Sequence, residues 1–162
     1  MKKNCLIAAF SVVLAFGFLV VGCENPAGGE DPGIPGGGDN SGIYEKMIAK
    51  KAQYPEGKSW TNADSYKWKA SNFTGHGCAA FAMILSDAAF GDAPHRQHTN
   101  FNNLRVGDIL RMNGDTHSAI ILAIDDSLIT LAEGNWNSKI HWGRQIPVTY
   151  DQLDYVWTRY SD

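Results

Sequence analysis

The sequence predicts an α+β domain in which helices come first and an antiparallel sheet follows. Helical patterns occupy the first half of the domain, at residues 43–54 and 78–90. From residue 106 the chain changes to short β-rich runs that are separated by turn residues. Helices followed by a series of strands are typical of α+β domains. The expected strands are 109–112, 116–124, 128–135, 139–146 and 155–160, and a capping-box pattern at 149–152 predicts a short helix before the last of them.

The two helical segments differ in pattern. Residues 43–54 have apolar side chains on one face only, which indicates an amphipathic helix. Residues 78–90 are apolar nearly all round, and their alanine, methionine and leucine side chains favour a buried helix. Glycines precede and follow this second segment. Cys78 is therefore expected in the first turn of the second helix.

The N-terminus has the pattern of an export signal. Lys2 and Lys3 precede an apolar run at 6–21, which is shorter than the roughly 20 residues that a membrane-spanning helix needs. Residues 20–23, Val-Val-Gly-Cys, resemble the lipobox of bacterial lipoproteins, in which the cysteine is lipidated and becomes the new N-terminus. We expect a signal peptide at 1–22 and a lipid anchor on Cys23. The alternative is an ordinary cleaved signal followed by an unrelated cysteine.

The segment after the signal separates the anchor from the domain. Residues 23–42 are dominated by glycine, proline and acids, so they bury too little apolar surface to fold and are expected to form a disordered tether. Residues 43–162 form the domain. Loss of the two signal lysines takes the net charge from −3 to −5. An acidic chain without a basic cluster argues against nucleic acid as a partner. The expected location is outside the cytoplasm, on a bacterial membrane that faces the periplasm or the cell surface.

Cys78 is the unpaired thiol of the mature chain. The sequence has three cysteines; Cys5 leaves with the signal and Cys23 carries the lipid, so Cys78 has no partner for a disulfide. A thiolate nucleophile needs a lowered pKa, a base within reach and a third group that orients the base. The start of a helix favours the thiolate. We therefore predict that Cys78 is a nucleophile, although an isolated cysteine of this kind is more often a small core residue.

His117 is the predicted base, because it begins a predicted strand whose pairing can be estimated. With a turn at 125–127, residue 124 faces 128, residue 121 faces 131 and His117 faces Asn135. Glu133 lies on the same face, because side chains alternate along a strand. Both Glu133 and Asn135 are candidates for the orienting group. This face also carries Ala119, Ile121 and Leu131, and we expect the alanine-rich helix to pack on it.

At these residues the chain resembles a known family. The resemblance rests on Gly77-Cys78 at a helix start, Val106-Gly107-Asp108, Thr116-His117-Ser118 and Glu133-Gly134-Asn135-Trp136. Together they resemble the CHAP family of papain-like cysteine amidases and peptidases. Tyr66, twelve residues before Cys78, is similar to a tyrosine of the related NlpC-type peptidoglycan peptidases.

The resemblance implies a papain-like fold and a cysteine hydrolase that cleaves amide bonds of peptidoglycan peptides. It implies the catalytic residues Cys78, His117, Glu133 and Asn135, with Tyr66 as a possible neighbour of the oxyanion or the thiol. No cofactor or metal is expected. Trp68 and Trp136 are candidates for the substrate cleft, with core packing as the alternative.

Two other functions stay open. Cys78 stands between Gly77 and Ala79, where the NlpC type has Asp and Ser, and this difference favours a non-catalytic lipoprotein of the same fold that binds the wall or a partner. The third hypothesis is an amide hydrolase or transferase that acts on a substrate other than the cell wall.

Overall fold

The structure is a computed structural model that describes residues 40–161, and it belongs to the mixed α+β class. The predicted signal peptide, the Cys23 anchor and nearly all of the predicted tether lie outside the described residues. Within residues 40–161 there is no helix long and apolar enough to cross a membrane. The elements are α1 Asn40–Ile48, the 3-10 helix η1 Ala49–Ala52, β1 Ser65–Lys67, β2 Thr74–His76, α2 Gly77–Phe90, β3 Arg96–His98, the 3-10 helix η2 Phe101–Asn103, β4 Ile109–Met112, β5 His117–Ile124, β6 Leu128–Trp136, β7 Lys139–Pro147 and β8 Leu153–Thr158.

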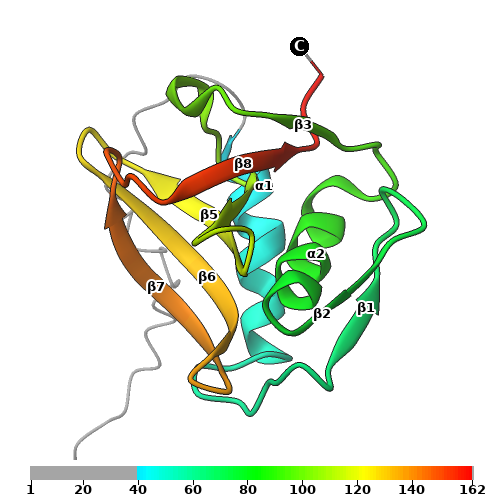
Figure 1. The fold of residues 1–162 in the computed structure, drawn as a ribbon. Helices are drawn as coiled ribbons and strands as arrows, with labels where there is room; N and C mark the ends of the chain where they lie inside the picture. The colour runs from blue at the N-terminus through cyan, green and yellow to red at the C-terminus, as the bar shows by residue number, and fades with distance from the viewer. Residues whose placement is uncertain (1–39, 162) are drawn as a thin grey trace, which may run out of the picture. The chain divides into compact units, whose positions relative to one another are not determined.

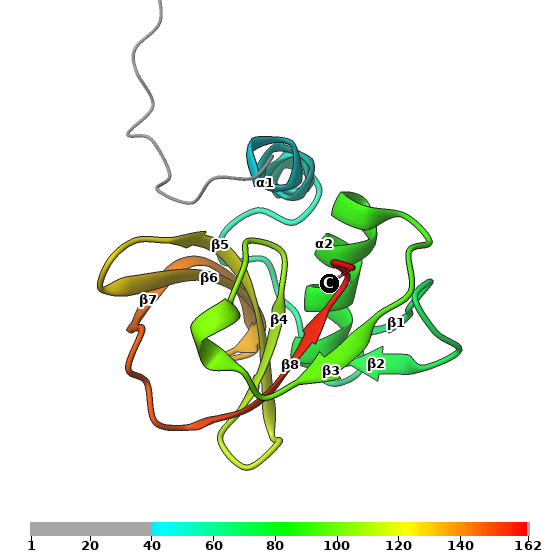
Figure 2. The same cartoon turned by 90° about the horizontal axis from the view of Figure 1, so that it is seen from above.

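A six-stranded antiparallel sheet makes up the second half of the fold (Figure 1). Its strand order is β3-β8-β4-β5-β6-β7, and β1 and β2 form a separate two-stranded sheet. Helix α2 packs on β5 and β6, and the β1–β2 pair packs on α2. Figure 2 shows α2 between the large sheet and the β1–β2 pair. The chain therefore enters α2 directly from β2, and the start of this helix lies beside the sheet.

Helix α2 is buried for nearly its whole length, as its sequence predicts. Its side chains form the main core with the residues of the sheet that face it, including Ile120, Leu122 and Ala132. The helix begins at Gly77, whose φ of 53° favours glycine, and it ends before Gly91, whose N–H donates to the Asp87 carbonyl.

The predicted face of contact between helix and sheet is wrong. Ala119, Ile121 and Leu131 do not face α2; they form a second apolar cluster with Leu110 and Val156 on the opposite face of the sheet. From Ala119 to Ile124 every residue of β5 is apolar, because both faces of this part of the sheet carry core side chains. The sequence pattern alone therefore could not assign one face to the helix.

The register of the β5–β6 hairpin agrees with the prediction at one end only. Ile121 faces Leu131 as predicted, but Ile124 faces Ile129 rather than 128. A bulge between Ile121 and Ala123 inserts the extra residue.

Two elements differ from the sequence prediction. Residues 149–152 are turns rather than a helix, with the Tyr150 N–H donating to the Pro147 carbonyl. The polar segment between the second predicted helix and residue 106, for which the sequence predicts no strand, contains β3, whose residues pair with β8 at the edge of the sheet. Three residues are too few to show the alternation that predicts a strand.

Aromatic side chains fix the start of α2 on the sheet. The Trp60 indole Nε1 donates to the Gly77 carbonyl over 2.8 Å, and the Trp60 and Phe81 rings meet edge to face with centroids 5.9 Å apart. Gly134 of β6 lies against the Trp60 ring and the Cβ atom of Phe81. A Cβ atom at Gly134 would come within 2.5 Å of Phe81 Cβ and 2.8 Å of Trp60.

We expect Gly134→Ala to destabilise the fold by about 1–3 kcal/mol, the usual cost of forcing extra volume into a packed core. The measurement is urea unfolding followed by tryptophan fluorescence. Gly114→Ala is the comparison variant. The positive φ of Gly114 adds backbone strain to any substitution there, but nothing lies within 4 Å of the added methyl group, so this variant does not crowd the core. If Gly134→Ala unfolds at the wild-type urea concentration, the close packing of this junction is wrong.

Candidate active site

Cys78 is the second residue of α2 and lies against the first residues of β5. Its side chain is hydrogen-bonded to His117 and to the backbone of Ser118, and 9% of the residue is exposed. The first turn of α2 contains no acidic side chain. The positive end of the helix dipole therefore favours a negative charge on the sulfur.

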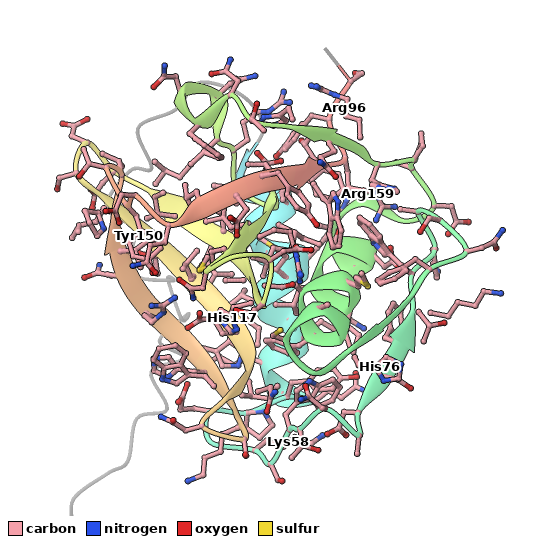
Figure 3. All side chains as sticks on the ribbon, in the orientation of Figure 1. Lys58, His76, Arg96, His117, Tyr150 and Arg159 are labelled. Atoms are coloured by element: carbon pink, nitrogen blue, oxygen red, sulfur yellow. The ribbon has the colours of Figure 1, made fainter. Side chains whose placement is uncertain are left out.

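His117 lies between the thiol and a buried carboxylate. Its Nε2 is 2.8 Å from Oε1 of Glu133, whose side chain is fully buried. This leaves Nδ1 as the ring nitrogen available to Cys78. Figure 3 shows His117 between β6 and α2, and His117 is the first residue of β5. The contact between helix and strand is therefore made around the end of β5, and not across the sheet face that the sequence predicted.

Charge separation between the thiol and the imidazole is favoured. Burial of the ring opposes its protonation, but the hydrogen bonds and charges of Cys78 and Glu133 outweigh it and raise the pKa of His117 to about 9. Burial likewise opposes ionisation of the thiol. Its hydrogen bonds to His117 and Ser118, with the positive charges of His117 and Arg111, nevertheless lower the pKa of Cys78. Both shifts favour the form of the pair in which the thiol is ionised and the imidazole is protonated.

Glu133 has a second partner that the sequence did not predict. Arg144 of β7 donates from Nε to Glu133 Oε2 over 2.8 Å. Its guanidinium also lies 4.5 Å from the Trp136 ring centroid. Arg144 is eleven residues from Glu133 in sequence, but it faces Leu131, two residues before Glu133 on β6, so the Arg144 and Glu133 side chains lie on the same face of the sheet. No sequence signal marked this residue.

Arg111 is the other cation that sequence reasoning missed. It faces Ser118 across β4 and β5, and its Nη1 donates to the Ser118 hydroxyl. Its Nε donates to Asp115 Oδ1 over 2.7 Å, and Tyr155 donates to the same oxygen. Asn113-Gly114, between the predicted strands 109–112 and 116–124, is a strong sequence signal for a hairpin. The register of that hairpin places Arg111 beside Ser118.

Asn135 does not contact the imidazole. Its Nδ2 donates to Asn62 Oδ1 over 2.9 Å, and its backbone has a φ of 58°. A register shift between Glu133 and Trp136 turns the strand at this point. Asn135 and Asn62 instead border Gly77, where an added Cβ would lie 2.3 Å from Asn62 Oδ1. The structure thus brings Cys78, His117 and Glu133 together and places Asn135 at the start of α2.

The Tyr66 prediction needs correction. Tyr66 donates from its hydroxyl to Asp87 Oδ2 over 3.0 Å, nine residues further along α2 than Cys78. Burial, together with the bond to Asp87, raises the pKa of Tyr66 to about 12. Its hydroxyl is therefore held away from the thiol by a buried network.

The two predicted cleft tryptophans have different surroundings. Trp68 is 1% exposed and packs against His95 and Trp157, so it is a core residue. Trp136 is 37% exposed, and its ring centroid is 6.0 Å from that of His117. Trp136 therefore remains a candidate for the wall of the substrate cleft.

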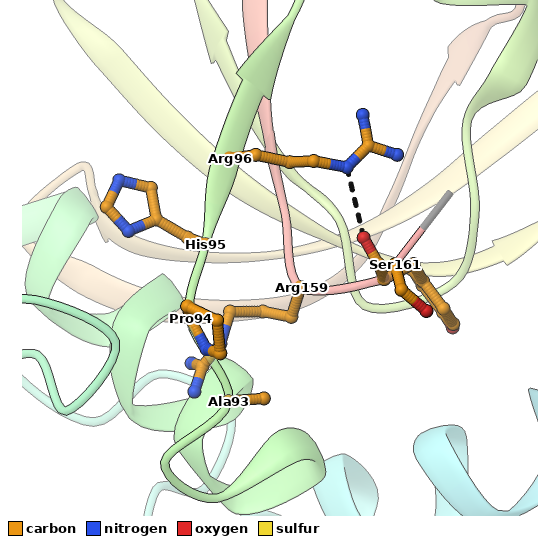
Figure 4. A pocket seen from close by; sticks show the side chains of 7 residues that line it. Ala93, Pro94, His95, Arg96, Arg159 and Ser161 are labelled. Carbon is orange, nitrogen blue, oxygen red and sulfur yellow. Dashed lines mark hydrogen bonds between the residues drawn. The ribbon is translucent and has the colours of Figure 1, made fainter.

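Two cavities in the described residues lie away from this site. One has a volume of about 340 Å³ and is lined by residues 93–96 and 159–161; at its rim Arg96 donates to the Tyr160 carbonyl over 3.1 Å (Figure 4). The other, of about 400 Å³, is bordered by Lys50, Tyr66 and Asp87. Neither is lined by Cys78, His117 or Glu133.

Comparison with known proteins indicates a similar fold but assigns no family. The sequence matches no family model and no curated protein. A solved structure described as the crystal structure of Ly7917 is similar with a TM-score of 0.51 and 15% sequence identity. The similarity covers 72% of this chain and 62% of Ly7917. At this identity it supports the α+β fold alone.

The described residues also contain no group of three or more His, Cys, Asp and Glu side chains arranged to hold a metal ion. They do contain a series of neighbouring groups: the Cys78 thiol, the His117 imidazole and the Glu133 carboxylate. Arg144 binds the carboxylate from its other side, and Arg111 lies near the thiol.

We expect the thiol of Cys78 to be alkylated by iodoacetamide at lower pH than free cysteine, because the thiolate is the reactive form and His117 stabilises it. Replacing His117 with alanine should shift the rate profile of alkylation to higher pH, with a loss of about tenfold or more at pH 6. The measurement is mass spectrometry of the labelled protein between pH 5 and 10. Profiles that coincide for wild type and His117→Ala would contradict the thiolate–imidazolium pair.

The roles of Glu133 and Asn135 can be separated by the titration of His117. Glu133→Gln keeps the side-chain shape but removes the charge, so the pKa of His117 should fall from about 9 by at least one unit. Asn135→Ala should leave this pKa within about 0.3 units. The measurement is NMR of labelled histidine rings against pH. The opposite ranking would make Asn135 the orienting residue.

Proposed function

We propose that this chain is a cell-envelope cysteine hydrolase that cleaves amide bonds in peptidoglycan peptides. The observation that carries the proposal is the contact series from Cys78 through His117 to the buried Glu133. A nucleophile, a base within hydrogen-bond reach and a group that orients the base are the parts that thiol catalysis needs. The peptidoglycan substrate and the lipid anchor rest on the sequence resemblance, and the papain-like arrangement is part of the same proposal.

The reaction proceeds through an acyl-enzyme. His117 holds the proton of Cys78, and the thiolate attacks the carbonyl carbon of the scissile amide. Negative charge that develops on the carbonyl oxygen is stabilised by the backbone N–H of Cys78 at the start of α2. His117 then gives its proton to the leaving amine. Water, deprotonated by His117, hydrolyses the thioester and restores the thiol.

Glu133 contributes by orienting the base. Its carboxylate accepts from Nε2 of His117, which fixes the imidazole tautomer and directs Nδ1 toward the sulfur. The same negative charge stabilises the imidazolium that forms with the thiolate. Trp136 beside His117 provides an apolar wall against which a substrate packs.

A second function is favoured by one observation. Cys78 is only 9% exposed, which is the accessibility expected of a packed residue and consistent with a wall-binding or partner-binding protein of the same fold. The Glu133 carboxylate argues for catalysis, because a fully buried charge beside an imidazole contributes little to a simple binding surface and is costly to keep.

The decisive test is digestion of defined muropeptides by the purified mature protein, with mass spectrometry of the products. We expect cleavage of one class of amide bond, and a loss of at least 10³-fold in rate for Cys78→Ala, because no other thiol remains in the domain. Tyr66→Phe serves as a matched control, since its hydroxyl is bonded to Asp87. Equal digestion by wild type and Cys78→Ala would disprove thiol catalysis, and binding without cleavage would favour the second function.

A further inference from the structure

The carboxylate of Glu133 is held from two sides. Oε1 is 2.8 Å from His117 Nε2, and Oε2 is 2.8 Å from Arg144 Nε. The Glu133 side chain is fully buried, whereas 20% of the Arg144 side chain is exposed. Arg144 is thus the part of this contact series that lies nearest to solvent.

One partner is not enough for a buried carboxylate. An ionised side chain that leaves water loses several kcal/mol of hydration, and it stays charged only when its oxygens are paired. His117 supplies one donor and cannot fix the rotation of the carboxyl group about its own bond to the chain. A second donor on the other oxygen fixes that rotation and supplies a permanent positive charge, because arginine does not lose its proton in proteins.

Arg144 is itself held in place. Its guanidinium lies 4.5 Å from the Trp136 ring centroid, and Nη2 is 3.7 Å from the Met112 sulfur. Trp136 therefore contacts both Arg144 and, at 6.0 Å between ring centroids, His117. These contacts orient Nε toward Glu133.

We propose that Arg144 is a positioning residue of this site, which keeps the buried Glu133 carboxylate charged and turned so that Oε1 faces His117. The positioning of Glu133 by Arg144 does not depend on the proposed function. Only its use in catalysis rests on that function. Arg144 acts on Cys78 through Glu133 and His117, and it touches neither the thiol nor a reacting group.

The sign of the effect on His117 distinguishes this role from simple charge repulsion. The charged groups around His117 are Cys78 on α2, Glu133 on β6, Arg144 on β7 and Arg111 on β4, with Asp115 paired to Arg111. If Arg144 were only a nearby positive charge, its removal would favour the imidazolium and raise the pKa of His117. If it maintains Glu133, its removal weakens the support for the imidazolium and lowers that pKa.

The experiment compares Arg144→Gln with Lys139→Gln in the full mature chain. Lys139 is exposed on the same strand, and the donors to the Glu133 carboxylate are His117 and Arg144. Replacement of Lys139 therefore removes one positive charge without removing a contact with Glu133. We expect Arg144→Gln to lower the pKa of His117 by one unit or more and to slow alkylation of Cys78 at pH 6 about tenfold. Lys139→Gln should change neither. An unchanged or raised pKa of His117 in folded Arg144→Gln overturns the proposal.

A double-variant cycle tests whether the effect passes through Glu133. In the Glu133→Gln background, adding Arg144→Gln should lower the pKa of His117 no further, because the carboxylate is already absent. Two full and additive decreases would mean that Arg144 acts by another route. Such additivity would also overturn the proposal.

Arg144→Lys keeps the inference testable if Arg144→Gln does not fold. Lysine retains the charge but offers a single ammonium in place of a planar fork. The pKa of His117 should stay above 8 in this variant, and a lower value in the folded protein contradicts the proposal. These readouts need no substrate. A protein that cleaves no muropeptide but shows the predicted shifts would disprove the proposed function and leave the Arg144 assignment standing.

Discussion

The contact between the first turn of α2 and the end of the β5–β6 hairpin determines whether the site exists. Cys78 comes from a helix, while His117 and Glu133 come from strands, and they are 39 and 55 residues further along the chain. Gly134 allows Phe81 and Trp60 to approach β6 closely, and Trp60 binds the Gly77 carbonyl. The hydrogen bond from Trp60 to Gly77 and the absence of a side chain at Gly134 thereby hold the thiol against β5.

Charges of opposite sign alternate through this junction. The thiolate of Cys78 is followed by the imidazolium of His117, the carboxylate of Glu133 and the guanidinium of Arg144. Each buried charge is next to one of opposite sign, so the desolvation cost of each is offset by its neighbours. A single uncharged replacement leaves an adjacent charge with fewer partners. The members should therefore show strongly non-additive effects, as contacting residues in one network usually do.

The sequence predicted the site better than it predicted the packing around it. Glycines before an apolar helix placed Cys78 in the first turn, and alternation along β6 placed Glu133 on the side of His117. The choice between Glu133 and Asn135 depended on strand register, and the shifts near Ala123 and Trp136 changed that register locally. Arg144 was not predicted because the register was estimated only for the hairpin of residues 116–135, and the contact depends on the pairing of β6 with β7, in which Arg144 faces Leu131. The prediction of the sheet face that contacts α2 was wrong for a different reason, because both faces of β5 are apolar.

The far end of α2 explains why the thiol can be held so closely. Asp87 accepts from the Tyr66 hydroxyl, from the Lys69 N–H and from Arg159, and the Asp87–Arg159 pair is almost fully buried. Tyr66 belongs to β1, which pairs with β2, and β2 leads without a loop into Gly77. The chain from β1 to the end of α2 is therefore tied at one end to Arg159, the residue that follows β8, and at the other end to β6. A helix fixed at both ends has little freedom to slide, and a thiol that must stay within hydrogen-bond distance of an imidazole needs such a rigid support.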